Sequence, residues 1–167
     1  AWSLSEPYGA REWWPCKDHP SDKADSVRVT VTVPSIYRVG SQGLLVSETT
    51  NGGNKTFDWV SNYPISNYLV SIAVSDYTRY LASYVRPAPL AALYGPLTMP
   101  LDHLVYNDGS NALPSGWSQT GDMISVFEEW FGPYPFALEK YGHSECTFGG
   151  GMEHQTMTSL GGSSISL

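Results

Sequence analysis

The sequence of 167 residues predicts a mainly β protein, in which an antiparallel β-sandwich or saddle-shaped domain precedes the first part of an α/β domain. Three observations lead to this prediction. Residues 27–33 (VRVTVTV) alternate β-branched and polar side chains, as half-buried strands do. Residues 44–49 and 55–60 flank Asn51-Gly52-Gly53-Asn54, a glycine-rich hairpin turn. A helical pattern appears only after residue 107.

Further strands are predicted before residue 107. Residues 68–75 (YLVSIAVS) are markedly apolar and predict an inner strand, and residues 77–86 and 104–106 predict two more. Up to about residue 107 the pattern contains only strands and turns. We therefore assign residues 1–107 to the C-terminal portion of a β domain and residues 108–167 to the start of the second domain.

One helix is predicted near residues 120–131. Five apolar residues share one face at helical spacing and predict the buried face, with Glu128 and Glu129 on the opposite side. These five are Met123, Ile124, Phe127, Trp130 and Phe131. Thr120 is the expected N-cap, and Gly132-Pro133 is expected to end the helix. Short strands are then predicted at 143–148 and 155–160, on either side of three consecutive glycines at 149–151.

Composition excludes several functions. Nine Lys and Arg against sixteen Asp and Glu leave a net charge of −7, which offers little to a nucleic-acid backbone. No apolar run approaches the roughly 20 residues that span a bilayer. Cys16 and Cys146 are too few for a disulfide framework or a cysteine-based zinc site. Two separate buried thiols are favoured, and a disulfide between them stays open for an exported protein.

Local motifs in the second half are incomplete. Residues 142–146 (GHSEC) lack the final glycine of the Gly-x-Ser-x-Gly nucleophile turn, and the three glycines lack the residues that complete a phosphate-binding loop. The four histidines, His19, His103, His143 and His154, do not have the spacing of a zinc helix. Surface or hydrogen-bonded histidines are favoured, although a site assembled from distant loops remains open.

Two longer stretches occur in a fixed order. The first is EPYGAREWWPCKDHP at 6–20, followed by KAD at 23–25; the second comprises FGPYPF at 131–136, EKYG at 139–142 and GGMEHQT at 150–156. Together they resemble the zinc aminopeptidase family of aminopeptidase N and leukotriene hydrolase, the gluzincin aminopeptidases. The first is similar to that family's Glu-x-x-x-Ala-Arg-x-x-Phe-Pro-Cys-x-Asp-x-Pro-x-x-Lys-Ala segment. The second is similar to its Phe-Gly-x-Tyr-Pro-Phe helix end and Gly-x-Met-Glu-Asn motif.

The resemblance implies a substrate-binding site. Glu153, with Glu6 from the β domain, would bind the free ammonium group of a peptide, because charge-assisted hydrogen bonds are strong. The strand edge at Gly150 and Gly151 would pair with the substrate backbone, since residues without Cβ atoms allow close approach. The implied site also includes Met152 and His154. The other interpretation of Glu153 is an exposed carboxylate after a glycine turn.

Two residues depart from the family pattern. His154 stands where the family usually has Asn, a variant associated with an exported bacterial branch, and this implies a secreted or cell-envelope location. Leu4 stands where many members carry Gln, which removes one polar contact to the substrate.

The resemblance also implies a thermolysin-like α/β catalytic domain, whose zinc helix with His-Glu-x-x-His follows shortly after the Met-Glu motif. The sequence stops at Leu167, so we expect a fragment with no catalytic residue, no metal ligand and no bound zinc of its own, inactive alone. Zn²⁺ is expected in the parent enzyme, and the expected partners are peptides with a free N-terminus and the remainder of the catalytic domain. The alternative is a non-catalytic peptide-binding or interaction domain.

Overall fold

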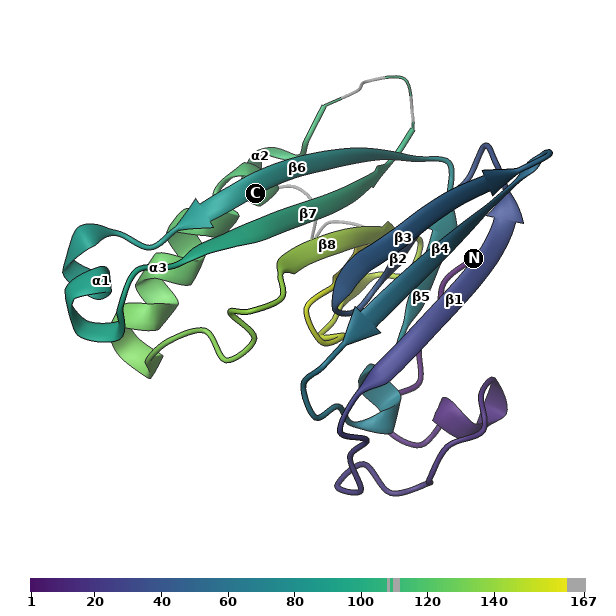
Figure 1. Cartoon of the computed structure of the whole chain (residues 1–167), viewed down its shortest axis with the longest axis horizontal. Helices are drawn as coiled ribbons and strands as arrows, with labels where there is room; N and C mark the ends of the chain where they lie inside the picture. The colour runs from purple at the N-terminus through teal and green to yellow at the C-terminus, as the bar shows by residue number, and fades with distance from the viewer. Residues whose placement is uncertain (108, 110–111, 162–167) are drawn as a thin grey trace.

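The computed structural model describes residues 1–107, 109 and 112–161. The turn residues 108, 110 and 111 and the last residues, 162–167, lie outside the described part. Figure 1 shows an elongated molecule with a three-stranded sheet at one end and a longer sheet with three helices at the other. The predicted mainly β fold, with antiparallel sheets before a helix and short strands, is confirmed.

The three-stranded sheet has the order β1-β4-β3 and is antiparallel throughout. Its strands are β1 (Val27–Pro34), β3 (Leu44–Asn51) and β4 (Asn54–Ser61). Half-buried and exposed residues alternate along β1, and its valines pack against Val39, Phe57 and Trp59. Gly52 adopts a positive φ of 59° in the turn between β3 and β4, which explains the glycine there. These strands and their hairpin match the prediction.

A two-stranded antiparallel sheet joins β2 (Arg38–Ser41) to β5 (Ile72–Ser75). The prediction of an inner strand over 68–75 is correct only for its second part, because the first part belongs to a 3₁₀ turn, η2 (Asn67–Leu69). Strand β5 pairs with β2 on one edge and is hydrogen-bonded to residues 1–3 on the other, with a bridge between Trp2 and Ala73. Its Ala73 also packs against the larger sheet, in a cluster with Leu104 and Met157.

The five-stranded sheet is mixed and has the order β6-β7-β8-β10-β9. Its strands are β6 (Tyr77–Val85), β7 (Thr98–Tyr106), β8 (Tyr141–Cys146), β9 (Gly150–Met152) and β10 (Thr158–Gly161). The β7/β8 and β8/β10 pairs are parallel, and the other two are antiparallel. This sheet draws strands from both sides of the predicted boundary at 107/108. The boundary remains a prediction, and sheet membership favours placing it before Tyr77.

Besides η2, the described residues form a second 3₁₀ segment, η1 (Ala10–Glu12), and the helices α1 (Ala88–Tyr94), α2 (Ser115–Ser118) and α3 (Thr120–Phe131). The prediction of only strands and turns before residue 107 is therefore wrong, because α1 lies between β6 and β7. This helix has seven residues and buries only Leu90, so it is too short to show helical periodicity. No helix in the described segments is long and apolar enough to cross a membrane.

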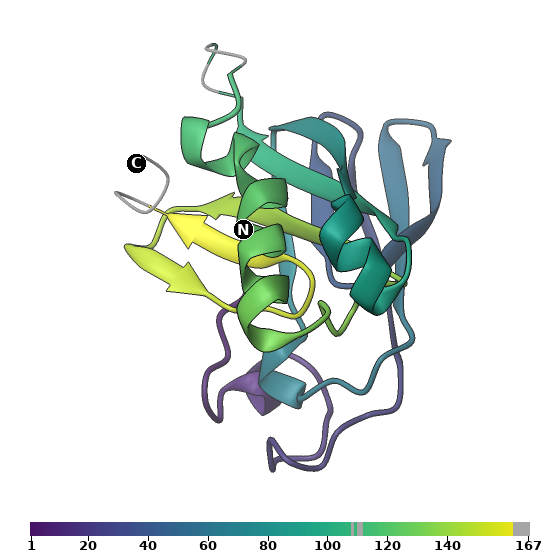
Figure 2. The ribbon, with the colours of Figure 1, turned by 90° about the vertical axis from the view of Figure 1, so that its left-hand side faces the viewer.

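Helix α3 lies across one face of the five-stranded sheet (Figure 2). Its bounds match the prediction, and Gly132 ends it with a positive φ of 88°. Thr120 is not its N-cap. Because α2 runs almost directly into α3, Gln119 occupies that position, and the Thr120 hydroxyl donates to the carbonyl of Trp117 at 2.7 Å.

The predicted buried face of α3 is largely wrong. Only Ile124 of the five apolar residues is buried, and it packs against Tyr84, Met99 and Leu101 of the sheet. The exposed fractions of Met123, Phe127, Trp130 and Phe131 are 39%, 60%, 74% and 83%. The described residues therefore leave an apolar stripe of α3 facing outward.

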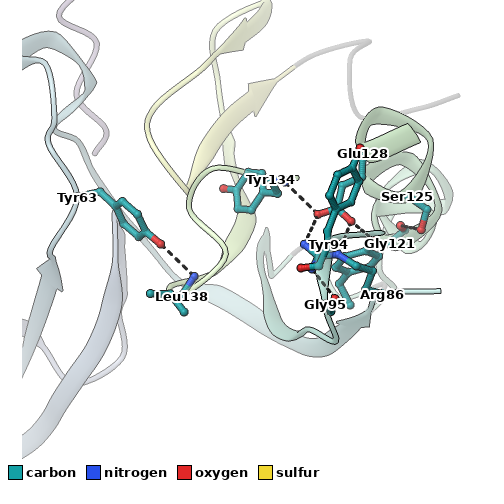
Figure 3. Close-up of polar contacts among 10 residues, drawn as sticks. Tyr63, Arg86, Tyr94, Gly95, Gly121, Ser125, Glu128, Tyr134 and Leu138 are labelled. Carbon is teal, nitrogen blue, oxygen red and sulfur yellow. Dashed lines mark hydrogen bonds and ion pairs between the residues drawn. The ribbon is translucent and has the colours of Figure 1, made fainter. Parts of the chain in front are cut away.

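Glu128, predicted on the outer face, is buried because Arg86 of the adjacent segment neutralises it (Figure 3). Arg86 donates two hydrogen bonds to its carboxylate, at 2.7 and 2.8 Å, and the Tyr84 hydroxyl and the Tyr134 backbone N–H donate two more. The hydrogen bonds from Arg86 hold the pKa of Glu128 low, at about 2. The same guanidinium donates to the carbonyl of Gly95 just after α1, so one ion pair joins two helices to the sheet.

Candidate functional site

Five of the six site residues predicted from the sequence, at 150–154, lie on or directly after β9, the edge strand of the larger sheet. Along the ladder β9 pairs only with β10, with Met152 opposite Ser159 and Gly150 opposite Gly161. Its other edge carries no strand within the described residues. Unpaired backbone groups on such an edge can accept an extended peptide as an added strand.

The two glycines of β9 differ in what their backbone requires. Gly150 has a φ of 92°, which L-residues with side chains rarely adopt, and no described atom lies within 4 Å of the position of a Cβ. At Gly151 a Cβ would lie 2.7 Å from the Leu160 side chain, on the β10 side. Glycine is therefore required at 150 by the backbone conformation and at 151 by the packing against β10. Both glycines are exposed.

The side chains of Met152 and Glu153 lie in different environments, the first buried and the second exposed. The Met152 side chain is buried and secures the end of β9. Glu153 is exposed, and its carboxylate takes part in no ion pair among the described residues. An exposed carboxylate directly after an open strand edge has the charge and the position to meet a cationic chain end.

His154 is buried, with 1% of its surface exposed. Its Nδ1 lies 2.9 Å from the Ser159 hydroxyl of β10, and its Nε2 has no partner among the described residues. Burial lowers the pKa of His154 to about 4, so the imidazole is neutral at pH 7. In this structure the His154 side chain contacts β10 through Ser159. Its predicted contact with a substrate stays a prediction.

The turn after Glu153 is held by groups far away in the sequence. Thr156 has a φ of 60°, an uncommon conformation for a β-branched residue that tends to occur at functional sites. Its hydroxyl accepts a hydrogen bond from the Gly43 backbone N–H at 2.8 Å, and its carbonyl accepts one from Lys140 Nζ at 3.0 Å. Contacts from the smaller sheets and the 139–140 segment therefore fix the backbone that carries Glu153.

Lys140 is the central residue of this support. It is almost fully buried, donates a second hydrogen bond to the Ser41 carbonyl at 3.1 Å, and lies with Nζ 5.2 Å from the Trp59 ring centre. Burial lowers the pKa of Lys140 to about 8. The neighbouring Glu139 accepts hydrogen bonds from the Asn62 N–H at 2.6 Å and from the Ser61 hydroxyl at 3.0 Å. Two adjacent charged residues thus attach the site to the smaller sheets, Lys140 to β2 of the two-stranded sheet and Glu139 to the end of β4 in the three-stranded sheet.

The sequence analysis assigned no role to Glu139, Lys140 or Thr156, although all three lie in the quoted motifs. A signal was present, because consecutive charged residues between a helix end and a strand are unusual in an apolar setting. Their partners could not be predicted, since Lys140 and Ser41 are separated by 99 residues.

Glu6 lies on the N-terminal segment and is exposed. This segment is attached to the β8–β9 loop by Trp2, whose indole Nε1 donates to the Thr147 hydroxyl at 3.0 Å and whose ring packs edge-on against Phe148. Trp2 also bridges to Ala73 of β5. The structure thus brings the Glu6 segment and the loop leading to Gly150 together, but it shows no direct contact between Glu6 and Glu153. Leu4 is half exposed and lines a shallow hollow of about 450 Å³ on this segment.

The described residues do not fit a zinc site. No group of three or more His, Cys, Asp or Glu side chains among them is placed to hold a metal ion. His103, His143 and His154 are buried, as expected for hydrogen-bonded histidines, and only His19 is exposed. Cys16 and Cys146 are both free thiols, the first half-buried and the second buried.

Comparison with known proteins shows which class of proteins this chain resembles. No protein-family model and no curated protein matches the chain. Among solved structures, an M1 zinc metallopeptidase from Deinococcus radiodurans is 28% identical, with a TM-score of 0.80 over 99% of this chain. A mutant form of that enzyme bound to a Tyr-Ser-Ala substrate is 30% identical, with a TM-score of 0.81 over 98% of this chain. A two-domain M1 zinc metallopeptidase mutant bound to L-arginine is 29% identical, with a TM-score of 0.79 over 96%.

The fold is therefore that of the M1 zinc metallopeptidases, and the family resemblance predicted from the sequence is confirmed, while the roles of the site residues stay a prediction. The chain spans 35–36% of the length of these solved structures. The substrates and the activity of those enzymes are therefore only proposed for this chain.

Proposed function

We propose that this chain forms the C-terminal portion of the β domain and the first part of the catalytic domain of a zinc aminopeptidase, and that β9 with Glu153 binds the N-terminus of a peptide. One observation carries the proposal: among the described residues, an exposed carboxylate without an ion-pair partner follows an open strand edge, on a turn fixed by buried Lys140. The similar enzymes in complex with L-arginine and with Tyr-Ser-Ala support it.

The proposed chemistry follows from the requirements of an exopeptidase. Such an enzyme must recognise a free ammonium group, and a carboxylate held beside a strand edge can accept charge-assisted hydrogen bonds from it. The backbone of β9 would pair with the following residues of the peptide and set its direction. Glu6 would supply a second negative charge from the N-terminal segment. A blocked N-terminus removes the positive charge and with it the reason for this recognition.

Zinc would polarise the scissile carbonyl and activate a water molecule in the parent enzyme. The described residues provide no ligand set for it, so no step of the hydrolysis is assigned to them. We expect the 167-residue chain to release no amino acid from an aminoacyl p-nitroanilide, with or without added zinc. A polypeptide extended through a His-Glu-x-x-His region is expected to hydrolyse it. Hydrolysis by the shorter chain, or none by the longer one, would contradict the proposal.

The remainder of the catalytic domain is the proposed partner of α3. Phe127, Trp130 and Phe131 are more than half exposed on one helix face, beside an apolar groove of about 270 Å³ that reaches Tyr141 and His143. Contiguous apolar surface of this kind commonly marks an interface.

The same surface also supports the second candidate function, a non-catalytic peptide-binding or interaction domain. The two candidates differ in the gene beyond the codon for Leu167. A His-Glu-x-x-His sequence within a few dozen residues supports the enzyme, and its absence supports the interaction domain.

A further inference from the structure

Two histidines face each other inside the larger sheet, away from the candidate site. His103 of β7 and His143 of β8 are directly opposite in the parallel ladder. Their Nδ1 atoms are 3.1 Å apart and their rings are stacked, with centres 5.1 Å apart and planes 14° from parallel. Both residues are buried, with exposed fractions of 1% and 8%.

This contact restricts the number of protons that the pair can carry. One Nδ1 must donate its proton to the lone pair of the other, so the neutral pair shares a single proton across the contact. His143 Nε2 has the Tyr141 hydroxyl as a further partner at 3.3 Å, and that hydroxyl also lies 3.1 Å from Thr158 Oγ1 of β10. If both Nδ1 atoms carried protons, two N–H groups would point at each other.

Helix α2 covers the pair with one side chain. The Trp117 ring stacks on His143, with centres 4.8 Å apart, and lies 5.8 Å from His103. Trp117 is buried, and it is the principal apolar anchor of the four-residue α2. Its indole N–H has no partner among the described residues, so stacking rather than hydrogen bonding holds it.

Burial, together with the nearby Lys140, lowers the pKa of His103 and outweighs the Asp102 carboxylate, which raises it. Asp102 of β7 is already paired with Arg79 of β6 at 2.8 Å, and buried Lys140 precedes β8. On the α3 side, Glu128 lines the same groove as His143 and is paired with Arg86. Helix α2 contributes no charged residue, and β10 contributes only the Thr158 hydroxyl.

We propose that the His103–His143 pair is an acid-sensitive anchor: protonation releases Trp117 and helix α2 from the sheet, while the C-terminal half of α3 remains docked. The two ends of the helical layer are held by different means. Stacking on neutral imidazoles holds α2, whereas the buried Arg86–Glu128 ion pair holds α3.

The size of the effect follows from the protonation of an exposed imidazole. Burial lowers the pKa of His103 to about 4, and burial together with the neighbouring His103 lowers the pKa of His143 to about 3. A histidine exposed by the release of α2 returns toward its ordinary pKa of about 6.5. At pH 5 each ring that becomes exposed therefore favours the open state by about 30-fold relative to pH 8.

Hydrogen exchange of the 167-residue chain tests the proposal. The amides of Trp117, Ser118 and Gln119 are hydrogen-bonded within the α2 turn, so their protection reports on α2. After correction for intrinsic exchange rates, their protection is expected to fall by at least about 30-fold between pH 8 and pH 5. The amides of residues 128–131 in α3, beside the Arg86–Glu128 ion pair, are expected to remain more protected than those of α2 at pH 5.

His143→Gln removes one titrating ring and is expected to reduce the acid-induced change at α2. His19→Gln is the matched control, because His19 is exposed on a distant loop, and it should leave the change intact.

A titration of the wild-type imidazoles by NMR covers the case in which the His143 variant does not fold. His103 and His143 should stay neutral until α2 loses protection. Protection of α2 at pH 5 that is no lower than that of α3, or protonation of both rings near pH 6.5 with α2 still protected, would overturn the proposal.

Discussion

The two larger sheets of the molecule differ in what determines which side of an element is buried against them. In the three-stranded sheet, the alternating valines of β1 turn toward Phe57 and Trp59, and hydropathy alone predicts the buried side. Beside the five-stranded sheet, α3 buries Glu128 and exposes Trp130 and Phe131.

This difference shows when a hydropathy pattern indicates the core. The partner surface of β1 lies within the same sheets, so pattern and burial agree. For α3, the side facing the sheet is fixed by the Arg86–Glu128 ion pair, and the apolar stripe faces away from the described residues. Under the proposed function, the remainder of the catalytic domain would cover this stripe.

A fall in pH is expected to have the largest effect on stability, and it acts on the five-stranded sheet. His103 and His143 lie in the five-stranded sheet, with pKa values lowered to about 4 and 3, and His154 beside it has a pKa of about 4. A pKa lowered below the unfolded value of about 6.5 contributes stability that is present above pH 6.5 and lost as the pH falls toward 4.

At pH 5 the loss is up to about 2 kcal/mol for each of the three histidines, or up to about 6 kcal/mol together. Urea unfolding followed at pH 7.5, 6 and 5 would measure it. A free energy of unfolding that is constant over this range would contradict the burial of these imidazoles.

Glu128→Gln is expected to have the next largest effect. It leaves Arg86 buried without its counter-charge, and breaking a buried ion pair in this way typically costs about 3–5 kcal/mol. Glu129→Gln is the matched control, because Glu129 is the exposed neighbour on the same helix. It should change the free energy of unfolding by less than about 0.5 kcal/mol. Similar losses for both variants would show that Glu128 is not the residue that fixes the face of α3.

Trp130→Ser is expected to have the smallest effect. A Trp in a core costs about 3–5 kcal/mol when truncated, but Trp130 is 74% exposed, so the change should stay within about 0.5 kcal/mol. Ile124→Ala, on the buried side of the same helix, should cost about 2–5 kcal/mol. Thermal or urea unfolding of the two variants compares the two faces of α3 directly. A larger loss of unfolding free energy for Trp130→Ser than for Ile124→Ala would reverse the assignment of the buried face.

Sequence patterns were sufficient where the determining contacts are local. The alternation in β1, the glycine turn after β3 and the glycine that ends α3 all act within a few residues. Helix α1 was missed because seven residues do not show a period. The burial of Glu128 depends on Arg86, 42 residues away, and could not be read from the helix itself.

The candidate site divides in the same way. Its exposed residues, Gly150, Gly151 and Glu153, were found because the motif is contiguous in the sequence. The residues that hold it in place were not assigned, because Lys140 and Thr156 act through Ser41 and Gly43 of the smaller sheets.

The most direct test of the account is the kinetics of Glu153→Gln in a polypeptide that extends through the zinc-binding region. Gln keeps the shape but removes the charge that would pair with a peptide ammonium. Losing one partner of such a pair costs about 2–5 kcal/mol, or roughly 30- to 4,000-fold in kcat/KM on peptides with a free N-terminus.

Any activity on N-acetylated peptides should change much less, and Glu129→Gln should leave both activities unchanged. A selective loss on free peptides is the predicted result. Equal losses on free and blocked peptides, or no loss on either, would contradict the assignment of Glu153 as the anchor for the substrate's N-terminus.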